Sequence, residues 1–155
     1  TSDQLCEIDR AAGTLRIVYR IAGKGTKEFS MLTSDHTITI LGPLGNGFTK
    51  KDKKAILIGG GIGIPPMLQL AKELTCEKSI VLGFRDEEFL SEEFEPYGTV
   101  YKSSDNGAIG VKGTVMDAIR QYGIEAQRFM PADQHRCFVR FRAMHWNMAS
   151  KHSYP

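Results

Sequence analysis

Four glycines and two prolines follow one another near the middle of the chain, in the run Gly59-Gly60-Gly61-Ile62-Gly63-Ile64-Pro65-Pro66. Glycine lets a ligand approach the backbone closely, and a turn that opens a helix leaves N–H groups unpaired at the positive end of that helix. Such turns bind anions, most often phosphate. We therefore predict a diphosphate site at Gly60, Gly61 and Gly63, with Pro66 where the dinucleotide fingerprint has its third glycine. The alternative is a tight turn without a ligand.

The turn stands between two apolar stretches that have different spacings. Residues 55–58, Ala-Ile-Leu-Ile, form a short continuous apolar run, which is typical of a strand buried on both faces of a parallel sheet. After the prolines, apolar residues recur at helical spacing, at Met67, Leu68, Leu70, Ala71 and Leu74. Proline suits the first helical position, where its missing N–H costs nothing. We expect a strand, the glycine turn and a helix from Pro65, in that order.

The rhythm of the sequence changes after residues 42–47, which are turn-forming throughout. Before them, Leu15–Ile21 and Thr37–Leu41 alternate as strands do, and a short helical stretch opens at Gly25-Thr26 between the two. After them, strands and helices alternate as in a doubly wound parallel sheet. The expected elements are a strand at 79–82, a helix at 87–95, a strand at 99–103 and a helix at 114–122. No such pattern continues past Gln127.

Length and composition narrow the classes of function. The 155 residues leave room for one domain, or for one domain and a piece of another, and 41% apolar residues are enough for a packed core. A net charge of +2 without a basic stripe argues against a nucleic-acid partner, and no apolar run is long enough to span a membrane. The three cysteines are scattered without metal spacing, which predicts no metal ligands and a cytoplasmic location.

Several of these pieces together resemble the ferredoxin-reductase-type flavoproteins, and among them the electron-transfer subunits of NAD-linked dihydroorotate dehydrogenases. The resemblance covers roughly residues 6–127 and is most specific where the linker at 41–48, Leu-Gly-Pro-Leu-Gly-Asn-Gly-Phe, precedes the glycine-proline turn. The other matching pieces are Val18-Tyr19-Arg20, Gly25-Thr26, Leu82-Gly83-Phe84-Arg85 and Ser104-Asp105-Asn106-Gly107.

The resemblance implies a β plus α/β fold. Residues 1–48 would form part of a flavin-binding β-barrel, and residues 49–130 would form an NAD-binding α/β domain with a doubly wound parallel sheet. FAD and NAD are the implied cofactors, and Asp105 is implied to be a further cofactor-binding residue. Because hydride transfer between nicotinamide and flavin needs no protein acid or base, we expect no catalytic residue.

Five residues are implied to bind FAD. Val18, Tyr19 and Arg20 would line it, and Gly25 and Thr26 would present a helix start to its diphosphate. Without the resemblance, Tyr19 is an ordinary strand aromatic and Arg20 a solvated charge. Asp105, implied to bind a cofactor, would likewise belong to a plain turn.

Both ends of the chain depart from the family pattern. Thr1–Gln4 stand where the family has Arg-Pro-x-Ser, and Pro131–Arg136 stand where a Cys-Gly-Pro stretch and the cysteines of a [2Fe-2S] cluster should follow. A shifted reading frame, within the codons that the protein allows, restores both motifs. We therefore interpret the ends as out-of-frame translations and residues 131–155 as an aberrant tail that lacks the cluster ligands. The coding DNA tests this interpretation.

The function expected from the resemblance is that of an electron-transfer flavoprotein subunit, here in a truncated copy. Electrons from dihydroorotate oxidation in a catalytic dihydroorotate dehydrogenase subunit, its partner in a hetero-oligomer, would pass through [2Fe-2S] and FAD to NAD in pyrimidine biosynthesis. One alternative is a subunit of another ferredoxin- or hydrogenase-linked NAD(P) oxidoreductase, and Arg85 could then serve a 2′-phosphate. The other alternative is a non-catalytic nucleotide-binding remnant.

Overall fold

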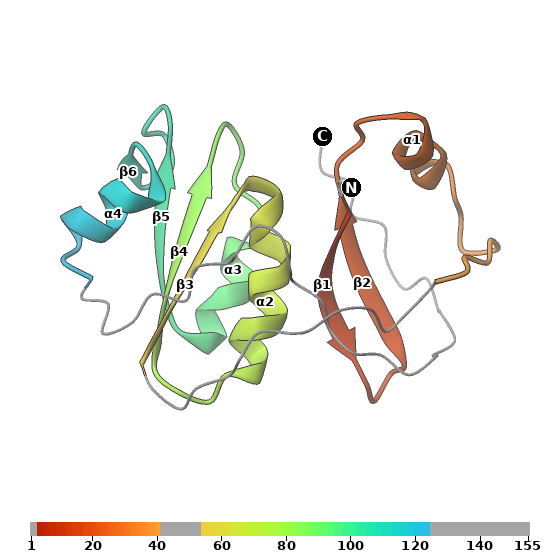
Figure 1. Cartoon of the computed structure of the whole chain (residues 1–155), viewed down its shortest axis with the longest axis horizontal. Helices are drawn as coiled ribbons and strands as arrows, with labels where there is room; N and C mark the ends of the chain where they lie inside the picture. Colours follow the sequence, from red (N-terminus) through yellow and green to blue (C-terminus); the bar gives the residue numbers. More distant parts are fainter. Residues whose placement is uncertain (1–2, 41–53, 125–155) are drawn as a thin grey trace.

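The structure is a computed structural model of the chain and describes residues 3–40 and 54–124. Two units lie side by side in it (Figure 1). The smaller consists of strands β1 (Asp3–Asp9) and β2 (Thr14–Tyr19) and helix α1 (Lys24–Ser30), and the larger is an α/β unit that begins at β3 (Ala55–Gly60). The linker at 41–48, the boundary between residues 48 and 49, and the tail at 131–155 lie outside the described residues.

The larger unit is built around a parallel sheet, as predicted. Four strands follow the order β3-β4-β5-β6, where β4 is Lys78–Phe84, β5 is Thr99–Ser104 and β6 is Val111–Lys112. Every neighbouring pair is parallel, and Ile58 of β3 is paired with Val81 of β4. The apolar run at 55–58 therefore forms the first four residues of a parallel strand, which confirms the prediction.

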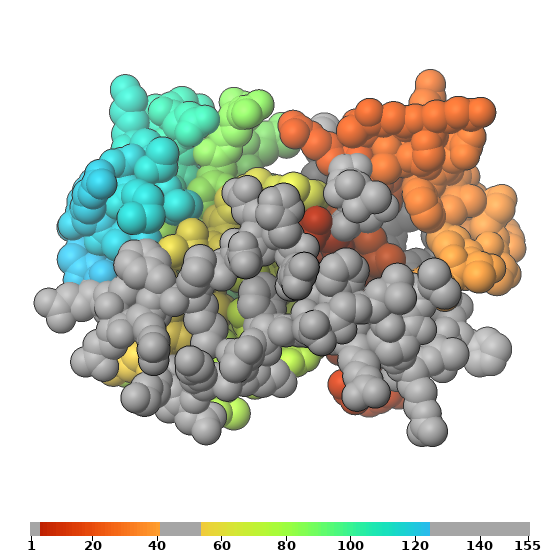
Figure 2. All heavy atoms as spheres, in the orientation of Figure 1, coloured from red at the N-terminus to blue at the C-terminus, as the bar shows by residue number. Residues whose placement is uncertain are grey.

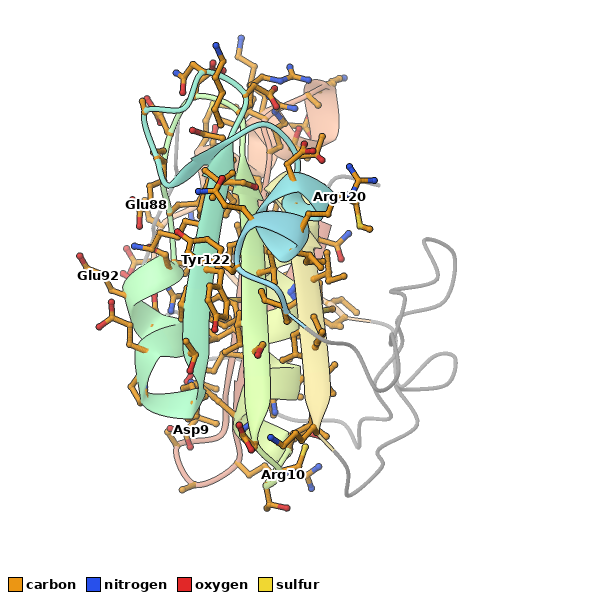
Figure 3. All side chains as sticks on the ribbon, turned by 90° about the vertical axis from the view of Figure 1, so that its left-hand side faces the viewer. Asp9, Arg10, Glu88, Glu92, Arg120 and Tyr122 are labelled. Carbon is orange, nitrogen blue, oxygen red and sulfur yellow. The ribbon has the colours of Figure 1, made fainter. Side chains whose placement is uncertain are left out.

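Helices cover both faces of this sheet, which makes it doubly wound. On one face α2 (Ile64–Glu73) and α3 (Ser91–Phe94) close a core that contains Leu57, Leu68, Ile80, Leu82 and Phe94. On the other face α4 (Val115–Gln121) covers a smaller core that contains Ile56, Val81, Val111, Ala118 and Ile119. Figure 3 shows α4, with Arg120 and Tyr122, in front of the sheet, and the Tyr122 ring packs 4.9 Å from that of Tyr101 in β5.

The smaller unit is an antiparallel pair of strands that packs against α2. β1 and β2 pair over their whole length, with a register shift between Leu5 and Glu7 that leaves Cys6 as the extra residue of a bulge. Cys6 and Val18 are buried in the same core cluster as α2 and the sheet. Helix α2 therefore lies between the parallel sheet and the β1–β2 pair, and it packs against both (Figure 1).

The structure corrects two of the predicted elements. Thr37–Ile40 are not a strand, because the described residues provide no neighbouring strand to take up their backbone hydrogen bonds. The helix expected at 87–95 is only α3, followed by the 3₁₀ turn η2 (Glu95–Tyr97). Leu90 interrupts it with φ of 60°, a left-handed conformation that an α-helix cannot include.

The other predicted elements are close to those observed. The strand at 79–82 is the middle of β4, the strand at 99–103 is β5 and the helix at 114–122 is α4 with the residues that cap it. The predicted strand Leu15–Ile21 is β2, which ends at Tyr19. In the described part of the chain, no helix combines the length and the apolar character needed to cross a membrane.

Candidate nucleotide-binding site

The predicted anion site is a strand–turn–helix corner. β3 ends at Gly60, Gly61–Gly63 form the single 3₁₀ turn η1, and α2 begins at Ile64, one residue before the expected Pro65. Gly61 has φ of +50°, which glycine adopts far more readily than other residues. The glycine at this position is what allows the chain to turn from strand to helix so sharply.

The space above the turn is open. A Cβ atom built on Gly60, Gly61 or Gly63 would meet no heavy atom within 4 Å. Gly59 differs, because its Cβ would lie 3.1 Å from the Cα of Ile64. Gly59 therefore serves the packing of the turn, whereas the other three glycines leave an exposed cradle that side chains would fill. Such a cradle fits a ligand that binds against the backbone.

The two prolines confine the free donors to the turn before them. Pro65 and Pro66 are the second and third residues of α2 and carry no N–H group. Pro65 is buried and Pro66 is half-buried, so apolar rings occupy positions where unpaired N–H groups would be costly. The Ile64 N–H donates to the Gly61 carbonyl. In the 3₁₀ turn the Gly63 N–H is directed at the Gly60 carbonyl, so the N–H groups of Gly61 and Ile62 are the donors that an anion at this helix start can use.

Asp105 lies at the same edge of the sheet, beyond the carboxyl end of β5. It is exposed, in a turn that Ser104 organises. The buried Ser104 accepts the Gly107 and Gly113 N–H groups at its carbonyl, at 3.1 and 2.9 Å, and the Ile109 N–H at its hydroxyl, at 2.9 Å. Since β4 lies between β3 and β5, Asp105 and the glycine turn stand two strands apart on the edge where open α/β sheets bind ligands.

Arg85 and the acidic residues after it follow the carboxyl end of β4. Arg85, Asp86, Glu87 and Glu88 are all exposed. Lys102 and the Ser91 hydroxyl both bond to Glu88, and these contacts hold the pKa of the Glu88 carboxyl below its usual value. Glu88 is therefore engaged in holding the loop against β5, while Arg85, the residue considered for a 2′-phosphate, lies next to a carboxylate of the opposite sign.

The residues implied to bind FAD are distributed around the smaller unit. Val18 is buried against α2 and the sheet, Tyr19 is half-buried and packs on the ring of Phe29 at 6.0 Å, and Arg20 is exposed. Gly25 and Thr26 are the second and third residues of α1. The Thr26 hydroxyl accepts the N–H groups of Ala22 and Gly23, at 2.9 and 3.2 Å, so two donors of this helix start are already paired.

Helix α1 lies on the side of the β1–β2 pair that faces away from the α/β unit (Figure 1), and its orange atoms lie far from the green and blue atoms of that unit (Figure 2). The glycine turn and Asp105 belong to one sheet edge, whereas Gly25 and Thr26 belong to this outer corner. The structure therefore places Asp105 at the same sheet edge as the glycine turn and leaves the residues predicted to bind the FAD diphosphate at a separate place. In the described parts of the chain, no group of three or more His, Cys, Asp or Glu side chains could hold a metal ion.

The sequence reasoning missed the contacts between the two units. The guanidinium of Arg16 in β2 forms two hydrogen bonds with the carboxylate of Glu93 in α3, at 2.6 and 2.9 Å, across 77 residues of sequence. Glu7 of β1 pairs with Lys72 of α2, and the Ile8 N–H donates to the Gln69 amide oxygen at 2.9 Å. These residues read as ordinary solvated polar positions, and no local pattern predicts which of them meet.

Comparisons with known proteins agree with this geometry. No protein-family model matches the sequence. A curated relative from Listeria welshimeri is 43% identical in an alignment of 127 residues that covers 76% of this chain and 50% of the relative. One from Fusobacterium nucleatum is 39% identical over 130 residues (78% and 50%), and one from Geobacillus kaustophilus is 41% identical over 130 residues (78% and 51%). All three are named dihydroorotate dehydrogenase B (NAD(+)), electron transfer subunit.

The chain is a homologue of these electron transfer subunits. The resemblance predicted from the linker and the glycine turn is thereby confirmed, and the chain spans about half the length of the curated relatives it matches. A solved structure described as an NADH-dependent reduced ferredoxin-NADP oxidoreductase, studied for flavin-based electron bifurcation, is also similar. It is 31% identical with a TM-score of 0.61, covering 70% of this chain and 42% of the other.

The structural likeness confirms the predicted fold class. The antiparallel pair followed by a doubly wound parallel sheet is a ferredoxin-reductase-like arrangement. The individual roles predicted for Val18, Tyr19, Arg20, Gly25, Thr26, Pro66, Asp105 and the glycines of the turn stay predictions. Their positions agree best for the NAD set, which lies on one edge of the sheet.

Proposed function

We propose that this chain is the nucleotide-binding part of an NAD-linked electron-transfer flavoprotein subunit of the dihydroorotate dehydrogenase B type. The observation that carries the proposal is the open turn over Gly60, Gly61 and Gly63, where free N–H groups and the start of a ten-residue helix converge at the carboxyl edge of a parallel sheet. The diphosphate of NAD would lie against this turn. Homology to subunits whose names specify NAD(+) supports the same assignment.

A substitution at Gly60 tests the site without straining the backbone. Gly60 has φ of −132° and ψ of 130°, an extended conformation that valine favours, and its Cβ would enter open space. Gly60→Val should therefore fold normally and fill the volume needed by the diphosphate. We expect at least a tenfold loss of NADH affinity by isothermal titration calorimetry, about 1.4 kcal/mol. Gly61 is a poorer choice, because its positive φ would confuse strain with loss of binding.

The matched control is Gly23→Val. Gly23 is also extended, with φ of −177°, and nothing lies within 4 Å of its Cβ position, but it precedes α1 and not the glycine turn. We expect its NADH affinity to equal that of the unmodified chain. Equal NADH affinity of Gly60→Val and Gly23→Val would refute the proposed site.

The choice between NAD and NADP depends on the residues after β4. Arg85 could attract a 2′-phosphate, but the neighbouring Asp86 and Glu87 repel it and suit a ribose diol. We infer a preference for NADH over NADPH, in accord with the names of the relatives. Binding of NADP is the alternative, because the similar solved structure is described as a ferredoxin-NADP oxidoreductase. Tighter binding of NADPH in the same titration would favour that second class of oxidoreductase.

The flavin and the partner follow from the family. We propose that FAD lies against Tyr19 and Arg20, with its diphosphate at the start of α1 near Gly25 and Thr26. Val18 is buried, so it contributes packing or its backbone. A catalytic dihydroorotate dehydrogenase subunit would be the electron donor and partner in the cytoplasm, through a [2Fe-2S] cluster whose ligands are not among the residues described here. Co-purification with that subunit tests the assembly.

A further inference from the structure

Helix α2 is shared between the candidate nucleotide site and the contact with the smaller unit. Its first residue follows the glycine turn directly, and Gly59 packs against Ile64 so closely that turn and helix start cannot move independently. The later residues Gln69 and Lys72 contact β1. β1 also contacts the turn η1 itself. A displacement of α2 at the glycine turn therefore also changes its contact with β1, and the reverse holds as well.

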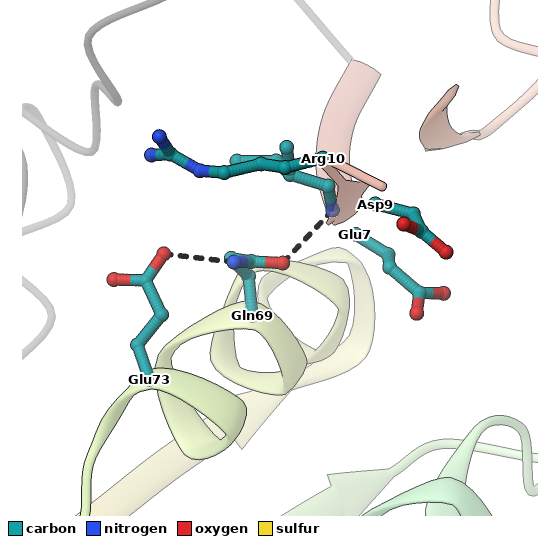
Figure 4. Close-up of a pocket in the computed structure, with 6 residues that line it drawn as sticks. Glu7, Asp9, Arg10, Gln69 and Glu73 are labelled. Atoms are coloured by element: carbon teal, nitrogen blue, oxygen red, sulfur yellow. Dashed lines mark hydrogen bonds between the residues drawn. The ribbon is translucent and has the colours of Figure 1, made fainter. Parts of the chain in front are cut away.

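Polar contacts of β1 with α2 fix the position of this helix against the strand. Gln69 accepts the Ile8 N–H at 2.9 Å and donates to Glu73 at 2.7 Å, so its amide is held on both sides (Figure 4). The Glu7 carboxylate pairs with Lys72, whose side chain is about a quarter exposed. The ammonium of Lys72 also lies 5.7 Å from the ring centre of Tyr97.

A bidentate ion pair fixes β2 in the same way. Arg16 reaches Glu93 of α3 through two parallel hydrogen bonds and lies 3.8 Å from Glu7. Its side chain is 23% exposed, so the pair is screened less than a surface ion pair. Arg16 precedes by two positions Val18, which is the first residue of the segment proposed to line FAD. We call Glu7, Arg16, Gln69, Lys72 and Glu93 the interdomain cluster.

Cys6 lies beneath this cluster and is wholly buried, at the bulge of β1. Its side chain belongs to the core that β1, β2 and α2 share. Reagents that modify thiols can reach it only when the two units separate or unfold, so it provides a chemical reporter for opening of the contact.

We propose that the interdomain cluster couples the two units through α2, so that a nicotinamide nucleotide at the glycine turn tightens the contact of α2 with the β1–β2 pair. Arg16 and Gln69 are then positioning residues, which hold the β1–β2 pair against the nucleotide unit without touching either cofactor. The coupling rests on the proposed function, but the cluster itself does not. Because binding linkage is reciprocal, loosening the contact must also weaken nucleotide binding by the same factor.

The test measures how fast an aromatic disulfide reagent labels Cys6, with Cys76→Ser and Cys137→Ser removing the other thiols. In the unmodified cluster we expect slow labelling, and saturating NADH should slow it at least threefold. Arg16→Met should accelerate labelling about threefold to tenfold and reduce the protection given by NADH. The acceleration cannot come from thiol ionisation, because the Arg16 charge lowers the pKa of Cys6 and its loss would slow the reaction.

Matched variants separate coupling from general loss of stability. Lys54→Met breaks the exposed ion pair between Lys54 and Glu77, at 2.9 Å, which joins nothing to the smaller unit, and it should leave the labelling rate unchanged. Arg16→Lys keeps a positive charge beside Glu93 and Glu7, so it should be labelled more slowly than Arg16→Met. Equal acceleration by Lys54→Met and Arg16→Met, or labelling of Arg16→Lys as fast as that of Arg16→Met, would overturn the role of the cluster.

The two proposals fail in different ways. If NADH does not bind at all, the proposed function is wrong, and labelling of Arg16→Met without nucleotide still decides whether the cluster closes the contact. If NADH binds but leaves the labelling of Cys6 unchanged, the nucleotide site stands and the coupling is refuted. If NADH slows labelling equally in Arg16→Met and in the unmodified chain, the coupling does not pass through Arg16.

Discussion

A Cβ atom on Gly59 would lie 3.1 Å from the Cα of Ile64 and 3.3 Å from the carbonyl oxygen of Gly63. Both atoms belong to the backbone, which cannot rotate away as the end of a side chain can. The end of β3 and the first turn of α2 therefore pack together only because residue 59 has no side chain. This contact, and not the anion site, is the reason for a glycine at that position.

Gly59→Ala should therefore destabilise the chain without touching the ligand space. We expect a loss of about 1–3 kcal/mol in the free energy of unfolding, as for an atom forced into a packed interior. Urea denaturation followed by circular dichroism measures it. Gly60→Ala, one residue later, enters open space and should change the free energy by less than about 0.5 kcal/mol. Equal losses for the two variants would contradict the assignment.

The start of α4 should depend on pH through Asp117. Its carboxylate accepts both the N–H and the hydroxyl of Thr114 at 2.7 Å, and these bonds lower the pKa of Asp117 below its ordinary 3.8. A lowered pKa means that the stabilisation is present above the ordinary value and is lost as the pH falls through the folded value. The melting temperature of the unmodified chain should exceed that of Asp117→Ala at pH 6, and the gap should narrow below pH 4.

The control for this pH dependence is Asp117→Asn, whose amide oxygen can still accept from Thr114 but carries no charge. The difference in melting temperature between Asp117→Asn and Asp117→Ala should not change with pH. A gap between the unmodified chain and Asp117→Ala that stays constant from pH 6 to pH 3 would show that the cap works without the carboxylate charge.

Cys6 should make the chain less stable in alkaline solution. Burial raises the pKa of its thiol from 9.0 to about 11, an effect that the Arg16 charge partly offsets. Between these values the unfolded chain loses the thiol proton while the folded chain keeps it, so stability falls as the pH rises, by about 1.4 kcal/mol per pH unit at most. Below pH 9 the thiol contributes no such slope.

Cys6→Ala isolates this contribution from the lysines and tyrosines that titrate in the same range. We expect the variant to be less stable than the unmodified chain at pH 8, because a buried sulfur is lost, and the difference to shrink between pH 9 and pH 11. Urea denaturation at each pH measures both free energies. Parallel curves would show that the Cys6 thiol ionises as freely in the folded chain as in the unfolded one.

The purified 155-residue chain should carry little flavin. In the described residues the sheet proposed to line FAD has only the strands β1 and β2. Ile17 and Ile21 are 36% and 51% exposed. Two donors at the start of α1 are paired with Thr26. The absorbance at 450 nm relative to that at 280 nm, after purification and after incubation with FAD, gives the flavin content. A yellow protein with stoichiometric FAD would show that these residues suffice for binding.

The order of elements in the α/β unit could be predicted because each element is contained in one segment. The apolar run at 55–58 and the helical spacing from Met67 to Leu74 reflect burial that local periodicity records. The glycine turn was predicted for the same reason, since backbone geometry determines which residue types it tolerates. The separate purpose of Gly59 could not be read from the sequence, because it depends on the distance to a residue five positions later.

The flavin-side elements were harder to predict. β1 was missed because the bulge at Cys6 breaks the alternation of its side chains, so no period of two runs through Leu5, Cys6 and Ile8. Thr37–Leu41 was predicted as a strand because its apolar and polar residues alternate. Such alternation shows that a strand would have two different faces, but it does not show whether a partner strand is present. Arg16 and Glu93 meet across 77 residues, and only the docking of the two units determines that pairing.

The paired prolines at the start of α2 have a spectroscopic consequence. Pro65 and Pro66 contribute no amide signal to a proton–nitrogen spectrum, so the free donors of the turn are observed through Gly61 and Ile62. Glycine amides occupy their own region of the nitrogen dimension, away from most other residues. A titration with nucleotide can therefore be followed on the signals of the turn before the rest of the spectrum is assigned. The feature that concentrates the donors also makes them separately visible.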